Sequence, residues 1–198
     1  MLYGNGIMES REEYSDKVFE AIDGKSLTVE ESVFESCTFR NCNFGGAAFK
    51  RCRFLDCTFE SCDLSNVALT GATLRAVTLR GCKCVGINFT YATTLVQLAF
   101  EKCVLSYAVF TGLDVRKAIL KDCVAREADF AEANLSEADL RGTDLAAARF
   151  ARTNLTKADL RGATNYSIRP EDNVLKKARF SLPEATLLLY GLGIELED

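Results

Sequence analysis

Residues 128–142 read ADFAE-ANLSE-ADLRG, which is one five-residue unit written three times. Each unit begins with Ala, continues with Asp or Asn, and has Phe or Leu in third place. An internal repeat of this regularity determines the architecture of a chain more strongly than any single motif. The fold must therefore be one in which equivalent residues recur every five positions.

The third residue of the unit, which we call the central residue, recurs through most of the chain. Towards the N-terminus it returns at every fifth position, at Phe34, Phe39, Phe44, Phe49, Phe54, Phe59, Leu64, Leu69, Leu74, Leu79, Cys84 and Phe89. After a slip of one residue it resumes at Leu95, Phe100, Leu105, Phe110, Val115, Leu120, Ala125, Phe130, Leu135, Leu140, Leu145, Phe150, Leu155 and Leu160. The residue two places earlier is mostly Ala or Cys, so each unit has a large and a small apolar position.

The spacing of these two positions predicts extended backbone that turns once in every unit. Residues two apart on extended backbone point to the same face, but five is odd, so strict alternation would send the next pair to the other face. A turn in each unit resets the alternation, and a chain that turns so often coils on itself. An α-helix is excluded, because residues five apart lie about 140° apart around its axis.

A spacing of twenty indicates that four units make one coil. Among the central residues from 105 to 160, Phe occurs at Phe110, Phe130 and Phe150, and Cys42 and Cys62 have the same spacing. Like residues that stack on like in successive coils explain this. We expect the three phenylalanines to form a core ladder in a rod filled by side chains, with no internal cavity for a small ligand.

The unit A-[D/N]-[L/F]-x-x resembles that of the pentapeptide-repeat family, whose members are right-handed quadrilateral parallel β-helices. The resemblance implies an all-β solenoid over residues 30–164. It would lie between an acidic N-terminal segment and cap at 1–29 and a C-terminal cap at 165–198, with a short capping helix and a dimerisation tail. Such a motif is specific for the fold and does not by itself define a function.

One extra residue interrupts the period at residues 90–94, in the stretch TYATT. The commonest effect of such an insertion is a bulge or a kink of the rod. The slip also makes Tyr91 a candidate partner-binding residue.

The nine cysteines follow the repeat, with eight at the small position and Cys84 at a central one. Because a buried free cysteine behaves as a small apolar side chain, we interpret them as core residues. Zinc is the alternative at Cys82 and Cys84, but tetrahedral coordination needs converging ligands, and the sequence has no histidine to join them. Disulfides are disfavoured because no signal peptide directs the chain to an oxidising compartment. We expect a cytoplasmic protein without metal or cofactor.

The sequence offers little for catalysis, since histidine and the G-x-S-x-G, P-loop and G-x-G-x-x-G motifs are absent. A carboxylate pair such as Asp139 and Asp159, one coil apart, would lie on an open rod without a water-excluding cleft. We predict that the protein is not an enzyme and binds no small-molecule substrate, and we keep both aspartates as candidate partner-binding residues.

Opposite charges recur at the coil spacing and predict a self-compensating surface. The pairs are Arg40 with Glu60, Glu60 with Arg80, Asp63 with Lys83, Asp129 with Arg149, Glu132 with Arg152 and Glu137 with Lys157. The net charge of -4 argues against direct binding of nucleic acid, which needs a basic stripe. No run of about 18 apolar residues predicts a membrane span.

The C-terminal segment is expected to be a helix with Ser181 as its N-cap and Glu184 completing a capping box. Its apolar residues exceed what one rod end needs, which favours a two-fold homodimer. The predicted dimerisation residues are Leu182, Ala185, Leu188, Leu189, Leu192 and Ile194.

The stretches 177–185, 192–196 and 82–89 resemble the albicidin-resistance pentapeptide proteins, relatives of Qnr and MfpA. The resemblance implies a homodimer that binds DNA gyrase, a type II topoisomerase, and shields it from topoisomerase poisons, partly through a DNA-like shape. The Qnr subgroup has longer loops that this sequence lacks, so a mechanism that depends on such a loop does not carry over. The alternative function is a protein-protein interaction scaffold with an unrelated partner, which the charge pairs favour.

Overall fold

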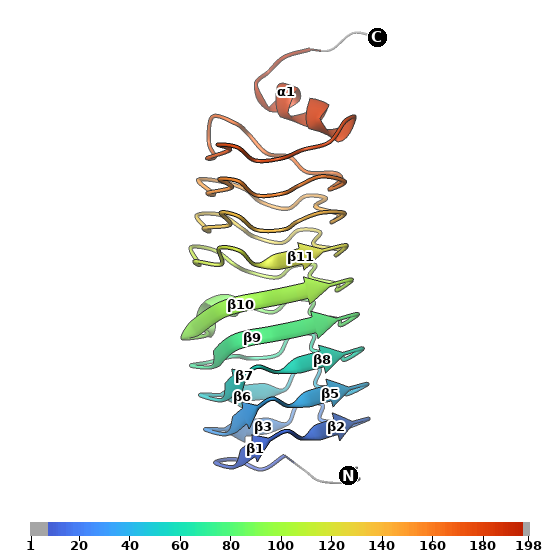
Figure 1. The fold of residues 1–198 in the computed structure, drawn as a ribbon, viewed down its shortest axis with the longest axis vertical. Helices are drawn as coiled ribbons and strands as arrows, with labels where there is room; N and C mark the ends of the chain where they lie inside the picture. Colours follow the sequence, from blue (N-terminus) through green and yellow to red (C-terminus); the bar gives the residue numbers. More distant parts are fainter. Residues whose placement is uncertain (1–7, 196–198) are drawn as a thin grey trace.

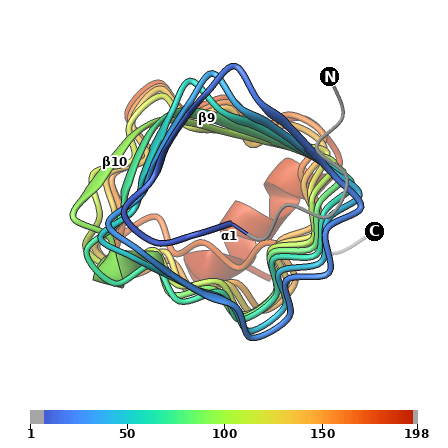
Figure 2. The ribbon, with the colours of Figure 1, turned by 90° about the horizontal axis from the view of Figure 1, so that it is seen from below.

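The chain forms a straight-sided rod of stacked coils, with its N-terminal strands at one end and its C-terminal helix at the other (Figure 1). The computed structural model describes residues 8–195. Seen along the rod, the coils superpose on a four-sided outline (Figure 2). The fold is a rod of parallel coils, as the repeat predicts, and is the right-handed quadrilateral parallel β-helix that the family resemblance implies.

Short parallel strands make up the sides of the rod. Those of three residues are β1 (Glu13–Ser15), β2 (Val18–Glu20), β3 (Thr28–Glu30), β4 (Val33–Glu35), β5 (Thr38–Arg40), β6 (Ala48–Lys50), β7 (Arg53–Leu55), β8 (Thr58–Glu60) and β11 (Ile119–Lys121). The two long strands are β9 (Thr73–Arg80) and β10 (Thr94–Glu101). The helical elements are the 3-10 turns η1 (Phe89–Tyr91) and η2 (Glu184–Thr186) and the helix α1 (Leu187–Gly191). No helix in the described part of the chain is long and apolar enough to cross a membrane.

The register of the strands confirms four units per coil. Phe34 pairs with Phe54, twenty residues on, and Phe100 pairs with Leu120. Between β9 and β10 the offset is twenty-one, as in the pairing of Leu74 with Leu95. The slip predicted from the sequence is thus accommodated in a single coil, at η1.

A left-handed residue two places after each central residue except Phe89 provides the predicted turn. After Phe34 it is Ser36, with φ 52°, and after Phe39 it is Asn41, with φ 50°. The Asp or Asn before the central residue supports the same turn, because its side chain accepts a backbone hydrogen bond. Asp129 Oδ1 accepts one from the Ala131 N–H at 2.9 Å. This contact explains why the second place of the unit is Asp or Asn.

The central side chains fill the rod, and like stacks on like. The ring centroids of Phe130 and Phe150 lie 5.3 Å apart, and the angle between the ring planes is 19°. All nine cysteines are free and buried, as predicted for core residues. Where cysteine holds the small position, its thiol donates to a carbonyl of the preceding coil, as from Cys57 Sγ to the Phe34 oxygen at 3.2 Å.

The regular pairing runs past residues 30–164 at both ends. β1 pairs with β4 and β2 with β5, so the acidic N-terminal segment contributes strands to the first coil. At the other end, Asp159 still pairs with Arg179.

The helix does not begin as the sequence predicts. The Ser181 hydroxyl accepts a hydrogen bond from the Gly162 N–H at 2.8 Å, so it does not cap a helix. Neither η2 nor α1 has a side-chain cap, and α1 is a short helix over the last coil (Figure 1). The capping box at Ser181 and Glu184 was therefore a wrong prediction.

Candidate interaction surfaces

The C-terminal end of the rod carries an exposed apolar surface. Leu182 is 80% exposed, Leu192 52% and Ile194 45%, and all three are predicted dimerisation residues. The other three, Ala185, Leu188 and Leu189, are half-buried, and Leu188 packs against the core. Tyr190, 56% exposed, belongs to the same surface. An exposed apolar cluster of this kind is typical of a protein interface.

Backbone contacts fix this surface on the rod. Gly191 lies so close to the preceding chain that a Cβ there would be 2.9 Å from the Ile168 carbonyl oxygen. Beyond the helix, Gly193 is left-handed, with φ 70°, and the Ile194 N–H donates to the Leu189 oxygen at 3.1 Å. Such a C-terminal turn holds Ile194 beside the helix. Leu196, which the sequence resemblance includes, lies outside the described residues.

The first coil, at the opposite end, is acidic. Glu12, Glu13, Asp16, Glu20 and Asp23 are all exposed, and within residues 8–195 none of these carboxylates forms an ion pair. The two ends of the rod therefore differ: the first coil exposes these acidic side chains, and the C-terminal end exposes apolar ones.

Asp139 and Asp159 face each other in successive coils, as predicted. Each is held by the arginine two residues on: Asp139 Oδ2 lies 2.6 Å from Arg141 Nη2, and Asp159 Oδ2 lies 2.7 Å from Arg161 Nη2. These guanidinium groups lower the pKa of both carboxyls. General acid-base catalysis at neutral pH needs a raised carboxyl pKa, so the arrangement suits charge pairing instead.

Most of the predicted charge pairs between coils form. Asp129 pairs with Arg149 at 3.2 Å, Glu137 with Lys157 at 3.5 Å, Arg40 with Glu60 at 2.8 Å, and Glu132 with Arg152. Two do not: in the described part of the chain no ion pair joins Asp63 to Lys83, and Arg80 pairs with Glu101 at 3.2 Å instead of with Glu60. Arg40 already occupies the Glu60 carboxylate, which explains the second difference.

Tyr91 ends the 3-10 turn that contains the inserted residue. Asn88 Oδ1 accepts hydrogen bonds from the Thr90 N–H at 3.0 Å and the Thr90 hydroxyl at 2.6 Å, which fixes the turn. Phe89 is buried, whereas Tyr91 is 61% exposed.

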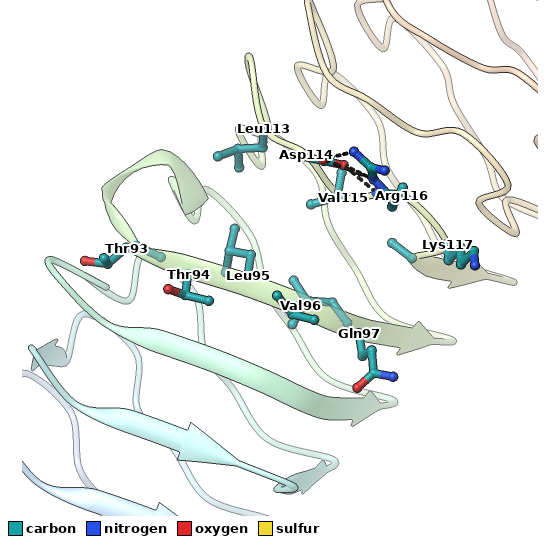
Figure 3. A pocket seen from close by; sticks show the side chains of 13 residues that line it. Thr93, Thr94, Leu95, Val96, Gln97, Leu113, Asp114, Val115, Arg116 and Lys117 are labelled. Atoms are coloured by element: carbon teal, nitrogen blue, oxygen red, sulfur yellow. Dashed lines mark hydrogen bonds and ion pairs between the residues drawn. The ribbon is translucent and has the colours of Figure 1, made fainter.

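A cleft of about 520 Å³ opens beside this turn, between β10 and residues 113–118 (Figure 3). It lies in the side of the rod, and the sequence did not predict it. The one-residue slip in the repeat indicates that the rod is irregular near residues 90–94, but it does not indicate that a cleft forms there.

The thiols offer no evident metal centre. Burial raises the pKa of Cys52 and raises that of Cys123 to about 11. Across residues 8–195, no three or more side chains of His, Cys, Asp or Glu gather closely enough to hold a metal ion.

Comparisons with known proteins agree on the architecture. A family model described as "Pentapeptide repeat region" matches residues 32–96, and one described as "Pentapeptide repeats (8 copies)" matches residues 126–164, together more than half of the chain. No curated protein matches the sequence.

Two solved structures of trypsin-treated variants of QnrB1, a plasmid-mediated fluoroquinolone resistance protein, align with TM-scores of 0.72 and 0.70. Each is 22% identical and covers 96% of this chain and 99% of the other. HetL, a pentapeptide repeat protein involved in heterocyst differentiation regulation from the cyanobacterium Nostoc sp. strain PCC 7120, aligns with a TM-score of 0.53. It is 17% identical and covers 85% of this chain and 87% of its own.

Proposed function

Because this chain belongs to the pentapeptide-repeat family, we propose that it is a non-enzymatic homodimer that binds DNA gyrase and protects it from topoisomerase poisons. The family includes QnrB1, a fluoroquinolone resistance protein, whose rod aligns with this one over 96% of the chain. The resemblance of the C-terminal sequence to the albicidin-resistance proteins supports the same function.

One observation carries the proposal: the two ends of the rod differ in kind. A two-fold dimer formed by the apolar surface around Leu192 and Ile194 covers that surface and leaves an acidic first coil at each outer end. Such a dimer is long, stiff and acidic at its tips. It complements the basic surface on which a type II topoisomerase holds DNA, partly by a DNA-like shape.

The paired charges along the rod limit how far it imitates DNA. Asp129, Glu132 and Glu137 are each neutralised by a cation of the next coil. Affinity must therefore come from shape and from the acidic tips, and we expect the interaction to depend on salt only moderately. We place this activity in the cytoplasm, where a reducing environment keeps thiols such as the nine free cysteines reduced.

A supercoiling assay tests the function. The protein should raise the concentration of albicidin or of a quinolone that is needed to block supercoiling by gyrase. At higher protein concentration it should inhibit gyrase alone, because the same contact competes with DNA. A pull-down with purified gyrase subunits should capture at least one of them.

The self-compensating rod surface favours a second candidate, a protein-protein interaction scaffold with an unrelated partner. If the protein neither protects nor inhibits gyrase from several bacteria, and no gyrase subunit binds, the scaffold takes the place of the first proposal.

A further inference from the structure

Backbone hydrogen bonds join each coil to the next in a fixed pattern. On the side of the rod that holds Leu135, the central residue and the residue two places on both donate to the next coil: Leu135 N–H to the Asn154 oxygen and Glu137 N–H to the Thr156 oxygen, each at 2.8 Å. In return, the Asn154 N–H donates to the Ala133 oxygen at 3.0 Å. Three bonds thus close this side between the two coils.

All three bonds are missing between β10 and the coil above it. Their donors would be the N–H groups of Leu95, Gln97 and Asp114, yet among residues 8–195 none of these donates a hydrogen bond to the facing coil. Nor do the carbonyls of Asp114 and Arg116 accept a backbone hydrogen bond from the described residues. We call this opening the seam, in which residues 93–97 face residues 113–117 (Figure 3).

Each wall of the seam is hydrogen-bonded along its other edge to the neighbouring coil. β10 pairs along its other edge with β9, as in Leu95 with Leu74. On the far wall, Val115 N–H donates to the Asn134 oxygen at 3.1 Å and Lys117 N–H to the Ser136 oxygen at 2.9 Å. Pairing across the seam resumes at Ala99 with Ile119. The seam is therefore a bounded opening between β10 and the anchored segment 113–117, and Figure 1 shows β10 tilting away from the coil above.

The sequence explains why the walls separate. The inserted residue displaces the start of β10, and Leu113 occupies a place that Thr93 holds in the coil before it and Ala133 in the coil after it. A leucine is too large for this small position. The space that results, about 520 Å³, has an apolar floor that includes Leu95, Leu113 and Val115.

One end of the seam is cationic. Gln97 and Lys117 hold equivalent places on the two walls there and are exposed, and within the described residues the Lys117 ammonium group makes no ion pair. Arg116, by contrast, is engaged by Asp114, with Nε 2.9 Å from Oδ1. An incoming carboxylate at this end would meet an unpaired positive charge.

We propose that the seam binds an extended peptide segment of a partner protein, which adds as a β-strand between the two walls. One extended strand offers hydrogen-bonding groups along both of its edges, which matches the unpaired groups of both walls. Every second side chain of the segment would point to the apolar floor, so those residues are apolar. An acidic residue lies at the end beside Gln97 and Lys117. The inference goes beyond gyrase binding and holds whether or not gyrase is the partner.

Amide hydrogen exchange of the full-length protein tests whether the edges are open. The amides of Leu95 and Gln97 should exchange at least about 100-fold faster than those of Leu135 and Glu137, which occupy the same places two coils on and are hydrogen-bonded. Equal protection of the two pairs would overturn the proposal, because it would mean that the seam is closed in solution.

A defined peptide panel tests the occupant. The probes are labelled hexapeptides with Val, Ile, Leu or Phe at alternate positions, Thr between them, and Glu at either the first or the last position. At least one should bind saturably and protect the amides of Leu95 and Gln97. Methylation of its alternate backbone nitrogens should weaken binding at least about 10-fold, because a strand pairs through those N–H groups.

A matched pair of variants tests the cationic end. Lys117→Glu should weaken the best peptide about 3-fold to 10-fold, whereas Lys157→Glu, at the same place two coils on and 56% exposed, should leave its affinity unchanged. The absence of binding across the panel, or binding that methylation leaves intact, would overturn strand addition. Equal affinity of the peptide for both variants would overturn the proposal that an acidic residue of the peptide lies beside Lys117.

Discussion

The rings of Phe110 and Phe130 lie parallel in successive coils, with centroids 5.2 Å apart and 10° between their planes. Phe130 is fully buried, and Phe150 stacks on its other face. The substitution Phe130→Ala removes a ring with partners on both sides and should lower the free energy of unfolding by about 3–5 kcal/mol.

Arg152→Ala is the control, because both side chains of its ion pair with Glu132 are exposed. This substitution should lower the free energy of unfolding by under about 1 kcal/mol. Denaturant unfolding of both variants checks the difference. Equal midpoints would show that the assignment of inward and outward residues is wrong.

The thiols should resist modification in the native state. All nine are buried, which denies a labelling reagent access, and burial also raises the pKa of Cys123 to about 11. Cys37 differs, because its hydrogen bond with Cys57 lowers its pKa to about 7, and it relies on burial alone. Labelling with a maleimide or a disulfide reagent should be slow until denaturant is added and then reach all nine cysteines. Rapid labelling of several thiols in the native protein would contradict a tightly packed core.

The apolar C-terminal surface should hold the dimer together. Leu192→Asp with Ile194→Asp places charge in the proposed interface and should give a folded monomer, since both side chains are exposed in the single chain. Val174→Asp is the matched control: its side chain is 52% exposed, as is that of Leu192, but it lies on the side of the rod. Sedimentation at micromolar concentration distinguishes the species. A monomeric parent protein would remove the dimer from the proposed function.

Acid should weaken the C-terminal half of the rod. The Arg141 and Arg161 guanidinium groups lower the pKa of Asp139 and Asp159, so both carboxylates stabilise the fold when ionised. This stabilisation is fully present above their unfolded-state pKa of about 3.9 and is lost as the pH falls through the lower folded-state pKa. Asp139→Asn with Asp159→Asn should reduce the pH dependence of the unfolding midpoint below about pH 4. An unchanged slope would show that these ion pairs contribute nothing.

The acidic first coil should determine the affinity for gyrase. Glu13→Gln, Asp16→Asn and Glu20→Gln together remove three exposed charges that form no ion pair among residues 8–195, and should weaken inhibition of supercoiling about 10-fold or more. The control is Glu127→Gln, Glu132→Gln and Glu137→Gln, which changes the net charge equally on the body of the rod. Equal loss in both triple variants would indicate that overall charge, and not the tip, governs binding.

The sequence predicts the coil, the register and the core because each repeats the same local rule. It predicts the first coil less well. Tyr14 and Phe19 continue the five-residue period, but the next central position is occupied by Gly24. That glycine is explained by the structure: a Cβ there would lie 2.7 Å from the ring of Phe44. A central residue can thus be absent where a neighbouring ring fills its space.

Two features could not be derived from the period. Ser181 has the sequence of a helix cap, but its hydroxyl accepts a hydrogen bond from Gly162, nineteen residues earlier, and such a contact is visible only once the last coil is placed. The seam depends on how β10 and Leu113 share the space left by one extra residue. A repeat defines where that residue falls, but not which hydrogen bonds are lost to accommodate it.

The seam also affects how the rod responds to force. Hydrogen bonds between coils run along the long axis, so tension or bending loads the successive joints in series. A chain of joints yields where bonds are missing, and three are missing on one side of the joint between the coils of β10 and Val115. The rod therefore consists of two stiff parts joined by a weaker connection. Strand pairing closes this connection at Ala99 and Ile119, and the connection can open at the seam.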